Sequence, residues 1–188
     1  MCQARSGNPA GELIRRDDCV LVIVDMQEKL LAVMSEKEKT LENNVKLARF
    51  AGIVGIPVLV TEQEKLGPTV AELRGVIEGF EPIGKLEFNA CQRGEFARAL
   101  EGLGRSTVLL TGIESHICIT QTALCLLRGY NVHVISDAVA SRAPENREIA
   151  LLRMGQAGVV ISSTEMAIYE LLGRAGTDEF KETLELVK

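Results

Sequence analysis

STVLLTGIESHICITQTALCLLRG, residues 106–129, is the stretch that decides the fold of this chain. Its run Thr107–Leu110 is rich in leucine and β-branched residues, which is typical of a buried parallel strand. The part after the glycine turn contains no Gly or Pro before its last residue and is rich in helix formers. The stretch therefore predicts a strand, a sharp turn and a helix, with Ser115 capping the helix N-terminus and Gly129 its C-terminus.

Cys118 falls in the first turn of that predicted helix. The partial positive charge of a helix N-terminus favours thiolate over thiol, so we expect it to lower the pKa of Cys118. Free backbone amides of the same turn would stabilise an oxyanion on a substrate carbonyl. One turn thus offers a nucleophile and an oxyanion hole. Cys91 is the main rival because it also precedes a predicted helix, but it lacks a preceding strand and glycine turn.

The composition narrows the class of protein. The chain has 188 residues, with 21 basic and 26 acidic side chains and a net charge of −5, and it carries no basic patch for nucleic acid or anionic membranes. The longest apolar run, 19–24, is too short to span a bilayer, and residues 1–16 lack the apolar core of a signal peptide. Five cysteines without metal-ligand spacing argue for free thiols. We predict a cytoplasmic protein without nucleic-acid or membrane partners.

Strand and helix patterns alternate along the chain. CVLVIVD at 19–25 predicts a central buried strand with Asp25 at its carboxyl end. Residues 62–84 lack a clear period and are expected to form an active-site loop with at most a short helix. Further strands are predicted at 57–61, 107–110, 131–136 and 159–162, while 81–88 is a brief strand or a loop carrying Lys85. Helices are predicted at 36–51, 95–103, 116–128, 145–156, 164–172 and 178–188.

This alternation predicts a three-layer α/β/α, Rossmann-like fold, with a six-stranded and mainly parallel sheet between helices. Residues 17–188 are expected to form a single domain after a flexible N-terminal arm at 1–16. If the sheet starts in its middle and doubles back, the strands that lead to Asp25 and Cys118 are neighbours at the reversal point. A ligand cleft opens at such a point.

A cysteine hydrolase needs a base, and the two histidines are poor candidates. His116 lies two residues before Cys118 and so points to nearly the opposite face of a helix, and His133 lies within a predicted strand. Asp25 is the alternative, although an ordinary carboxylate and thiol are mismatched by roughly 6 kcal/mol for proton transfer. Burial would have to raise the pKa of Asp25, and a cation such as Lys85 would have to lower the thiol pKa. From the residues alone, Asp25 as a turn cap and Lys85 as a solvated side chain stay open.

Four motifs occur in order: VIVDMQ at 22–27, GKLEFNA at 84–90, LLTGIESHICITQTALCLLRGY at 109–130 and SDAVASR at 136–142. Together they resemble the isochorismatase-like cysteine hydrolase family, whose relatives include nicotinamidases and N-carbamoylsarcosine amidohydrolases. The wording is most similar to small isochorismatase-domain proteins. The resemblance covers most of residues 17–172.

The resemblance implies a catalytic Asp, Lys and Cys, which match Asp25, Lys85 and Cys118. It also implies the strand order 3-2-1-4-5-6 and a non-proline cis peptide between Ile113 and Glu114. That bond would aim the Glu114 amide, together with the Cys118 amide, into the oxyanion hole.

One departure from the family concerns metal binding. Nicotinamidases bind a metal through an Asp-x-His pattern after the second strand, where this chain reads Thr61-Glu62-Gln63-Glu64. We therefore expect no metal and no cofactor, and nicotinamide is less favoured as a substrate.

The leading hypothesis is hydrolysis of an amide-type C–N bond of a small molecule through a thioester. A non-catalytic binding module on the same fold is the first alternative, and isochorismate vinyl-ether hydrolysis is the second. Gln27 orients Asp25 or caps the turn, Gln63 reaches the substrate, and Asp137 is a structural or supporting residue near the same rim. The family implies a homo-oligomer, a dimer or larger, and the apolar residues of the last helix are candidates for its contact. They are Leu184, Leu186 and Val187.

Overall fold

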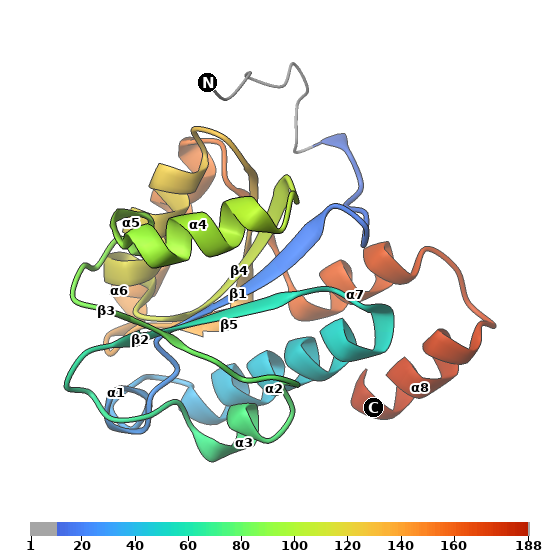
Figure 1. The fold of residues 1–188 in the computed structure, drawn as a ribbon, viewed down its shortest axis with the longest axis horizontal. Coiled ribbons are helices and arrows are strands. Elements are labelled where there is room, and N and C mark those ends of the chain that lie inside the picture. The colour runs from blue at the N-terminus through green and yellow to red at the C-terminus, as the bar shows by residue number, and fades with distance from the viewer. Residues whose placement is uncertain (1–10, 188) are drawn as a thin grey trace.

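The computed structural model describes residues 11–187, which contain a sheet of six strands (Figure 1). The strands are β1 (Cys19–Val24), β2 (Val58–Gln63), β3 (Ile83–Lys85), β4 (Thr107–Ile113), β5 (Asn131–Ala140) and β6 (Val160–Ser162). They lie in the order β3-β2-β1-β4-β5-β6, and every neighbouring pair is parallel. The predicted 3-2-1-4-5-6 order is confirmed, with the reversal between β1 and β4.

Helices cover both faces of the sheet (Figure 1). On one face lie α2 (Lys37–Val54), α7 (Thr164–Leu172) and α8 (Asp178–Val187), with the short α1 (Glu28–Leu31) and α3 (Ala71–Arg74). On the other lie α4 (Gly94–Gly102), α5 (Thr120–Leu126) and α6 (Pro144–Gln156). The predicted three-layer α/β/α fold is therefore confirmed. Among the described helices, none is long and apolar enough to cross a lipid bilayer.

The central strand β1 is buried on both sides. Leu21 and Ile23 belong to the apolar cluster under α2 and α7, whereas Val20, Val22 and Val24 belong to the cluster under α4, α5 and α6. Successive side chains of a strand point to opposite faces, so a strand covered twice has to be apolar at every position. This explains the continuous run that the sequence carries there.

Strands β1 and β4 approach closely where both end. Gly112 pairs with Val24 and has a φ of +112°, and a Cβ built on it would collide with the Val24 backbone. Only glycine fits a position of this kind. The two strand ends that lead to Asp25 and Cys118 are thereby held side by side.

The turn after β4 differs from the predicted single α-helix. Ser115–Ile119 forms a π-helical turn, and α5 begins only at Thr120. The Ser115 hydroxyl is buried and has no hydrogen-bond partner among residues 11–187, so the expected N-cap is wrong. The Ser115 carbonyl instead accepts from the Thr120 hydroxyl at 2.7 Å. The expected Gly129 C-cap is also wrong, because α5 ends at Leu126. The residue that follows, Leu127, has a right-handed helical backbone conformation.

Both ends of the described chain pack more closely than expected. Ile14 is buried and its amide donates to Glu170 Oε2, while Arg16 pairs with Glu179 of α8 at 2.8 Å. These contacts involve two residues of the arm predicted for residues 1–16, whose flexibility stays a prediction, and residues 1–10 lie outside the described residues. Leu186 and Val187, expected at an oligomer contact, are partly buried against the cluster under α2.

Candidate active site

Asp25 lies directly after β1, at the carboxyl end of the central strand. Its amide donates to the Thr61 carbonyl of β2 at 3.0 Å, and its φ is +54°. The side chain is fully buried, and Oδ1 accepts a 2.8 Å hydrogen bond from the Thr61 hydroxyl. The end of β2 therefore orients the Asp25 carboxylate.

Lys85 is the last residue of β3, on the far side of β2. It is fully buried, and its Nζ lies 2.6 Å from Asp25 Oδ2. The same Nζ donates to Gln63 Oε1 at 2.9 Å, and Gln63 Nε2 donates to the Leu86 carbonyl at 2.8 Å. The ammonium is thus fixed between a carboxylate and an amide oxygen.

Cys118 comes from the π-helical turn that follows β4. Its Sγ lies 3.9 Å from Lys85 Nζ, and the thiol also interacts with the Asp25 carboxyl. Only 5 % of Cys118 is exposed. The structure therefore brings Asp25, Lys85 and Cys118, from three distant parts of the chain, into one buried cluster.

Burial dominates the electrostatics of this cluster. It raises the pKa of Asp25, against the opposing effects of the Lys85 charge and of hydrogen bonds from Lys85 and Thr61. Burial, and secondarily the Asp25 charge, raises the pKa of the Cys118 thiol to about 12, although Lys85 opposes the shift. The expected low pKa of Cys118 is therefore wrong, because removing the thiolate from water outweighs the field of a single helical turn. Cys118 rests as a thiol.

The peptide bond between Ile113 and Glu114 is cis, immediately before the nucleophile turn. The Glu114 backbone amide lies against the Cys118 thiol and lowers its pKa, which opposes the effect of burial. The Glu114 carboxylate, 6 % exposed, forms an ion pair with Arg142, whose Nε lies 3.0 Å from Oε1 and donates to Oε2 at 3.2 Å. His116 does not face the cluster, because its Nδ1 lies 2.9 Å from the Ser141 hydroxyl.

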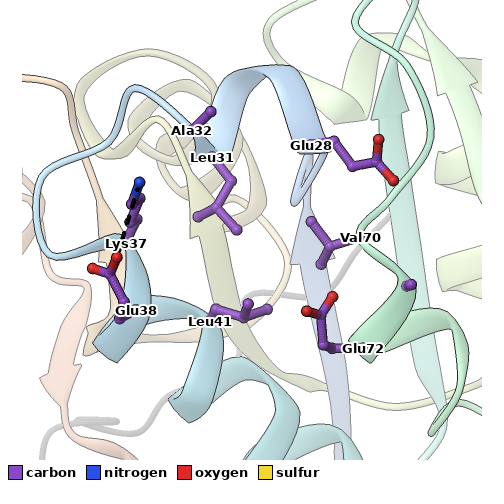
Figure 2. Close-up of a pocket in the computed structure, with 9 residues that line it drawn as sticks. Glu28, Leu31, Ala32, Lys37, Glu38, Leu41, Val70 and Glu72 are labelled. Atoms are coloured by element: carbon purple, nitrogen blue, oxygen red, sulfur yellow. Dashed lines mark ion pairs between the residues drawn. The ribbon is translucent and has the colours of Figure 1, made fainter.

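A pocket of about 240 Å³ opens onto Asp25 and Cys118. Its walls are Leu30, Val33, Gln63, Leu66, Phe88, Glu114, Ile117 and Arg142. A separate cavity of about 430 Å³ lies between α1 and the starts of α2 and α3 (Figure 2). It is lined by Leu31, Leu41, Val70 and charged side chains. None of the three clustered side chains lines that second cavity.

The weaker site predictions have different outcomes. Gln27 neither orients Asp25 nor caps a turn with its side chain: Nε2 donates to the Gln63 and Gly67 carbonyls and Oε1 accepts from the Gln63 amide. Gln63 lines the pocket, and its amide oxygen holds Lys85. Asp137 lies away from the pocket, where Oδ1 accepts from the amide and hydroxyl of Thr164 at the start of α7.

The sequence does not predict two features of the site. It predicts Thr61 only as the end of a strand, because the strand register that places the Thr61 hydroxyl on Asp25 has no local signal. The second feature is the ion pair between Glu114 and Arg142. Glu114 follows β4 and Arg142 follows the neighbouring strand β5, and this placement is a signal in the sequence that could have predicted their contact. Among residues 11–187, no group of three or more His, Cys, Asp or Glu side chains is placed to hold a metal ion.

The parallel three-layer fold carries an Asp-Lys-Cys cluster at its reversal point. The chain belongs to the isochorismatase domain family, whose domain model matches residues 19–166. This membership confirms the resemblance found in the four motifs.

Individual relatives agree with this assignment. The human isochorismatase domain-containing protein 2 is 38% identical over 172 residues, covering 90% of this chain and 82% of that protein. The structure named MAR1 ribonuclease from Caenorhabditis elegans has a TM-score of 0.88 and 34% identity, over 94% of this chain and 92% of that one. The Escherichia coli YcaC gene product, described as an octameric hydrolase of unknown specificity, has a TM-score of 0.84 at 23% identity, over 93% and 87%.

Proposed function

We propose that this protein hydrolyses an amide-type C–N bond of a small molecule through a thioester on Cys118. The observation that carries the proposal is the buried contact of Lys85 Nζ with both Asp25 Oδ2, at 2.6 Å, and Cys118 Sγ, at 3.9 Å. One cation contacts both the base and the nucleophile. It therefore stabilises the negative charge on Asp25 before the proton transfer and the negative charge on Cys118 after it.

The first step transfers the Cys118 proton to Asp25. The cluster holds one positive and one negative charge before the transfer and the same number after it, because the charge moves from carboxylate to sulfur beside Lys85. Burial raises both pKa values, so it opposes the carboxylate before the transfer as well as the thiolate after it. A separate cation or metal is not required for this transfer.

The sulfur then attacks the carbonyl carbon, and the oxygen gains a negative charge. Amides of Glu114 and Cys118 serve as the oxyanion hole, each contributing about 3 kcal/mol to the transition state. The C–N bond breaks as Asp25 gives its proton to the leaving nitrogen, which leaves a thioester.

Water completes the cycle. Asp25 takes a proton from water, the oxygen attacks the thioester carbon, and the C–S bond breaks. Asp25 returns the proton to the sulfur, so the net reaction adds one water across the C–N bond. The products are a carboxylic acid and an amine or ammonia.

The test is release of ammonia or amine from small amides, ureides and N-carbamoyl compounds. Cys118→Ala should abolish release, whereas the control Cys125→Ala, in the same helical segment, should retain it. Ammonia or amine release that survives in Cys118→Ala would favour amide hydrolysis without the thiol. An inactive chain whose Cys118 reacts with iodoacetamide no faster than its other cysteines would favour the binding module.

Assembly and location follow from the relatives and the sequence. The YcaC structure is described as octameric, and we infer that this chain also forms a homo-oligomer, which sedimentation would measure. A cytoplasmic location stays a prediction.

RNA is not the substrate that we propose, despite the name of the nematode relative, because the pocket is small and the chain has a net charge of −5.

A further inference from the structure

The pocket above Cys118 has an apolar side built from four separate segments. Leu30 and Val33 come from α1 and the turn after it, Leu66 from the loop after β2, and Phe88 from the loop after β3. Ile117, beside the nucleophile, completes this side. Leu30 and Ile117 also pack against the core clusters, whereas Val33, Leu66 and Phe88 belong to neither.

Two of these side chains are exposed although they are large and apolar. Val33 is 56 % exposed and Phe88 is 54 % exposed, and both line the pocket rather than packing into either apolar cluster of the core. Exposed apolar surface at a concave site marks a place where an apolar ligand group is covered.

α1 gives this wall a fixed position. Leu30 lines the active-site pocket, while its neighbour Leu31 is buried and lines the cavity on the other side of the helix (Figure 2). Because Leu31 packs into the core cluster under α2, Leu30 is held toward the reacting groups.

The charged groups of the site are already paired. Lys85 contacts Asp25, and Arg142 contacts Glu114 at 3.0 Å, so the four charges balance. Arg142, which is already paired with Glu114, is 59 % exposed in its side chain and lies outside the apolar side of the pocket. A substrate charge placed against that apolar side has no partner there and costs free energy.

The size of the pocket limits the substrate. Its volume of about 240 Å³ equals roughly eight water molecules of liquid volume. It therefore accommodates an amide with a short side chain.

We propose that the substrate is a small uncharged amide that carries a short apolar group, which lies against Leu30, Val33, Leu66 and Phe88. The inference rests on the proposed amide hydrolysis and adds the substrate class to it. The apolar wall sets specificity and disfavours analogues that place a charge against it.

The test compares kcat/KM of the full chain for matched primary amides. From acetamide through butyramide to valeramide, kcat/KM should rise about fourfold per added methylene, as expected for a chain that is removed from water. Succinamate and 4-aminobutanamide have a similar length but carry a charge, and both should be at least about tenfold poorer than valeramide.

Val33→Lys tests the wall directly. It should lower the ratio of kcat/KM for valeramide to that for succinamate by about tenfold or more, because it replaces apolar surface with a cation. The control Ile149→Lys makes the same change at a residue on α6 that is 63 % exposed and lies outside the pocket, and it should keep the wild-type ratio.

The outcomes separate the two proposals. Hydrolysis with no dependence on chain length, or with a preference for succinamate, overturns the apolar substrate class and leaves amide hydrolysis intact. No release from any amide, ureide or N-carbamoyl compound overturns amide hydrolysis itself, and the substrate class falls with it.

Discussion

The Thr61 hydroxyl donates a 2.8 Å hydrogen bond to Asp25 Oδ1, and both side chains are fully buried. Lys85 occupies the other carboxylate oxygen. Asp25 is therefore held at both oxygens, with its position fixed by the register of β2 against β1.

Thr61→Val removes this hydrogen bond and keeps the shape of the side chain. We expect kcat/KM to fall about tenfold, because a hydrogen bond to a charged group contributes roughly 1.5 kcal/mol. The bond lowers the pKa of Asp25, so its loss should also move the acid limb of the pH profile to higher pH. Thr111→Val, which changes another buried threonine of the sheet, should leave that limb in place; an identical shift in both variants would contradict the role of Thr61.

The pH profile of the wild-type protein reports on Asp25 as the base. Asp25 has to be ionised to accept the thiol proton, and burial raises its pKa above the usual 3.8. We expect kcat/KM to fall as the pH drops through this raised pKa, so the acid limb lies at higher pH than the usual carboxyl pKa would give. Asp25→Asn should remove both the limb and most of the activity, and a limb that persists in this variant would belong to another group.

Lys85→Met breaks the buried ion pair. Activity should fall at least about 100-fold, because the thiolate loses its cation, and the free energy of unfolding should fall by about 3–5 kcal/mol, because Asp25 is left unpaired. The double variant Asp25→Asn with Lys85→Met should recover most of the stability but none of the activity. Urea denaturation and amide turnover measure the two effects, and additive losses of stability would contradict the pairing.

His133 should make stability depend on pH. It is buried within β5, and burial lowers its pKa below the usual 6.5, with the Glu170 charge opposing the shift. At a pH between the pKa of His133 in the folded chain and its pKa in the unfolded chain, the unfolded chain binds more protons than the folded one. The contribution of neutral His133 to the free energy of unfolding is therefore complete above pH 6.5 and is lost as the pH falls toward the pKa of the folded chain.

The free energy of unfolding should therefore fall by at most about 1.4 kcal/mol per pH unit in this window on account of His133. His133→Phe should flatten the dependence when urea denaturation is compared between pH 7 and pH 5. Parallel curves for the two proteins would assign the dependence to other groups.

Gly112→Ala should prevent the close approach of β1 and β4. The added Cβ collides with the Val24 backbone at a φ of +112°, so we expect a loss of about 4 kcal/mol or more, or failure to fold. Gly102→Ala in α4 has open space around its Cβ and should be neutral or slightly stabilising. Circular dichroism and thermal unfolding distinguish the two, and equal stability of both variants would contradict the collision.

The fold followed from local patterns because each of them has a direct physical cause. The apolar run before Asp25 is buried on both faces, and the alternation of strands and helices allows few parallel sheets. The same reasoning was less reliable at Ser115, where a buried π-helical turn replaced the expected cap, and at Gly129, because α5 already ends at Leu126. At Ser115, buried tertiary packing outweighed the propensity of a single residue.

By itself the sequence determined the three-layer fold, the strand order through its family motifs, and the identity of Asp25, Lys85 and Cys118 as candidates. Tertiary structure alone decided that Lys85 contacts both Asp25 and Cys118. It also decided that Thr61 binds Asp25 and that Gln63 binds Lys85. Gln27 and Asp137 form their hydrogen bonds outside this cluster. Tertiary structure also decided the high pKa of Cys118. The physical reason is that contacts between strand ends and the loss of water depend on register and burial, which no local pattern encodes.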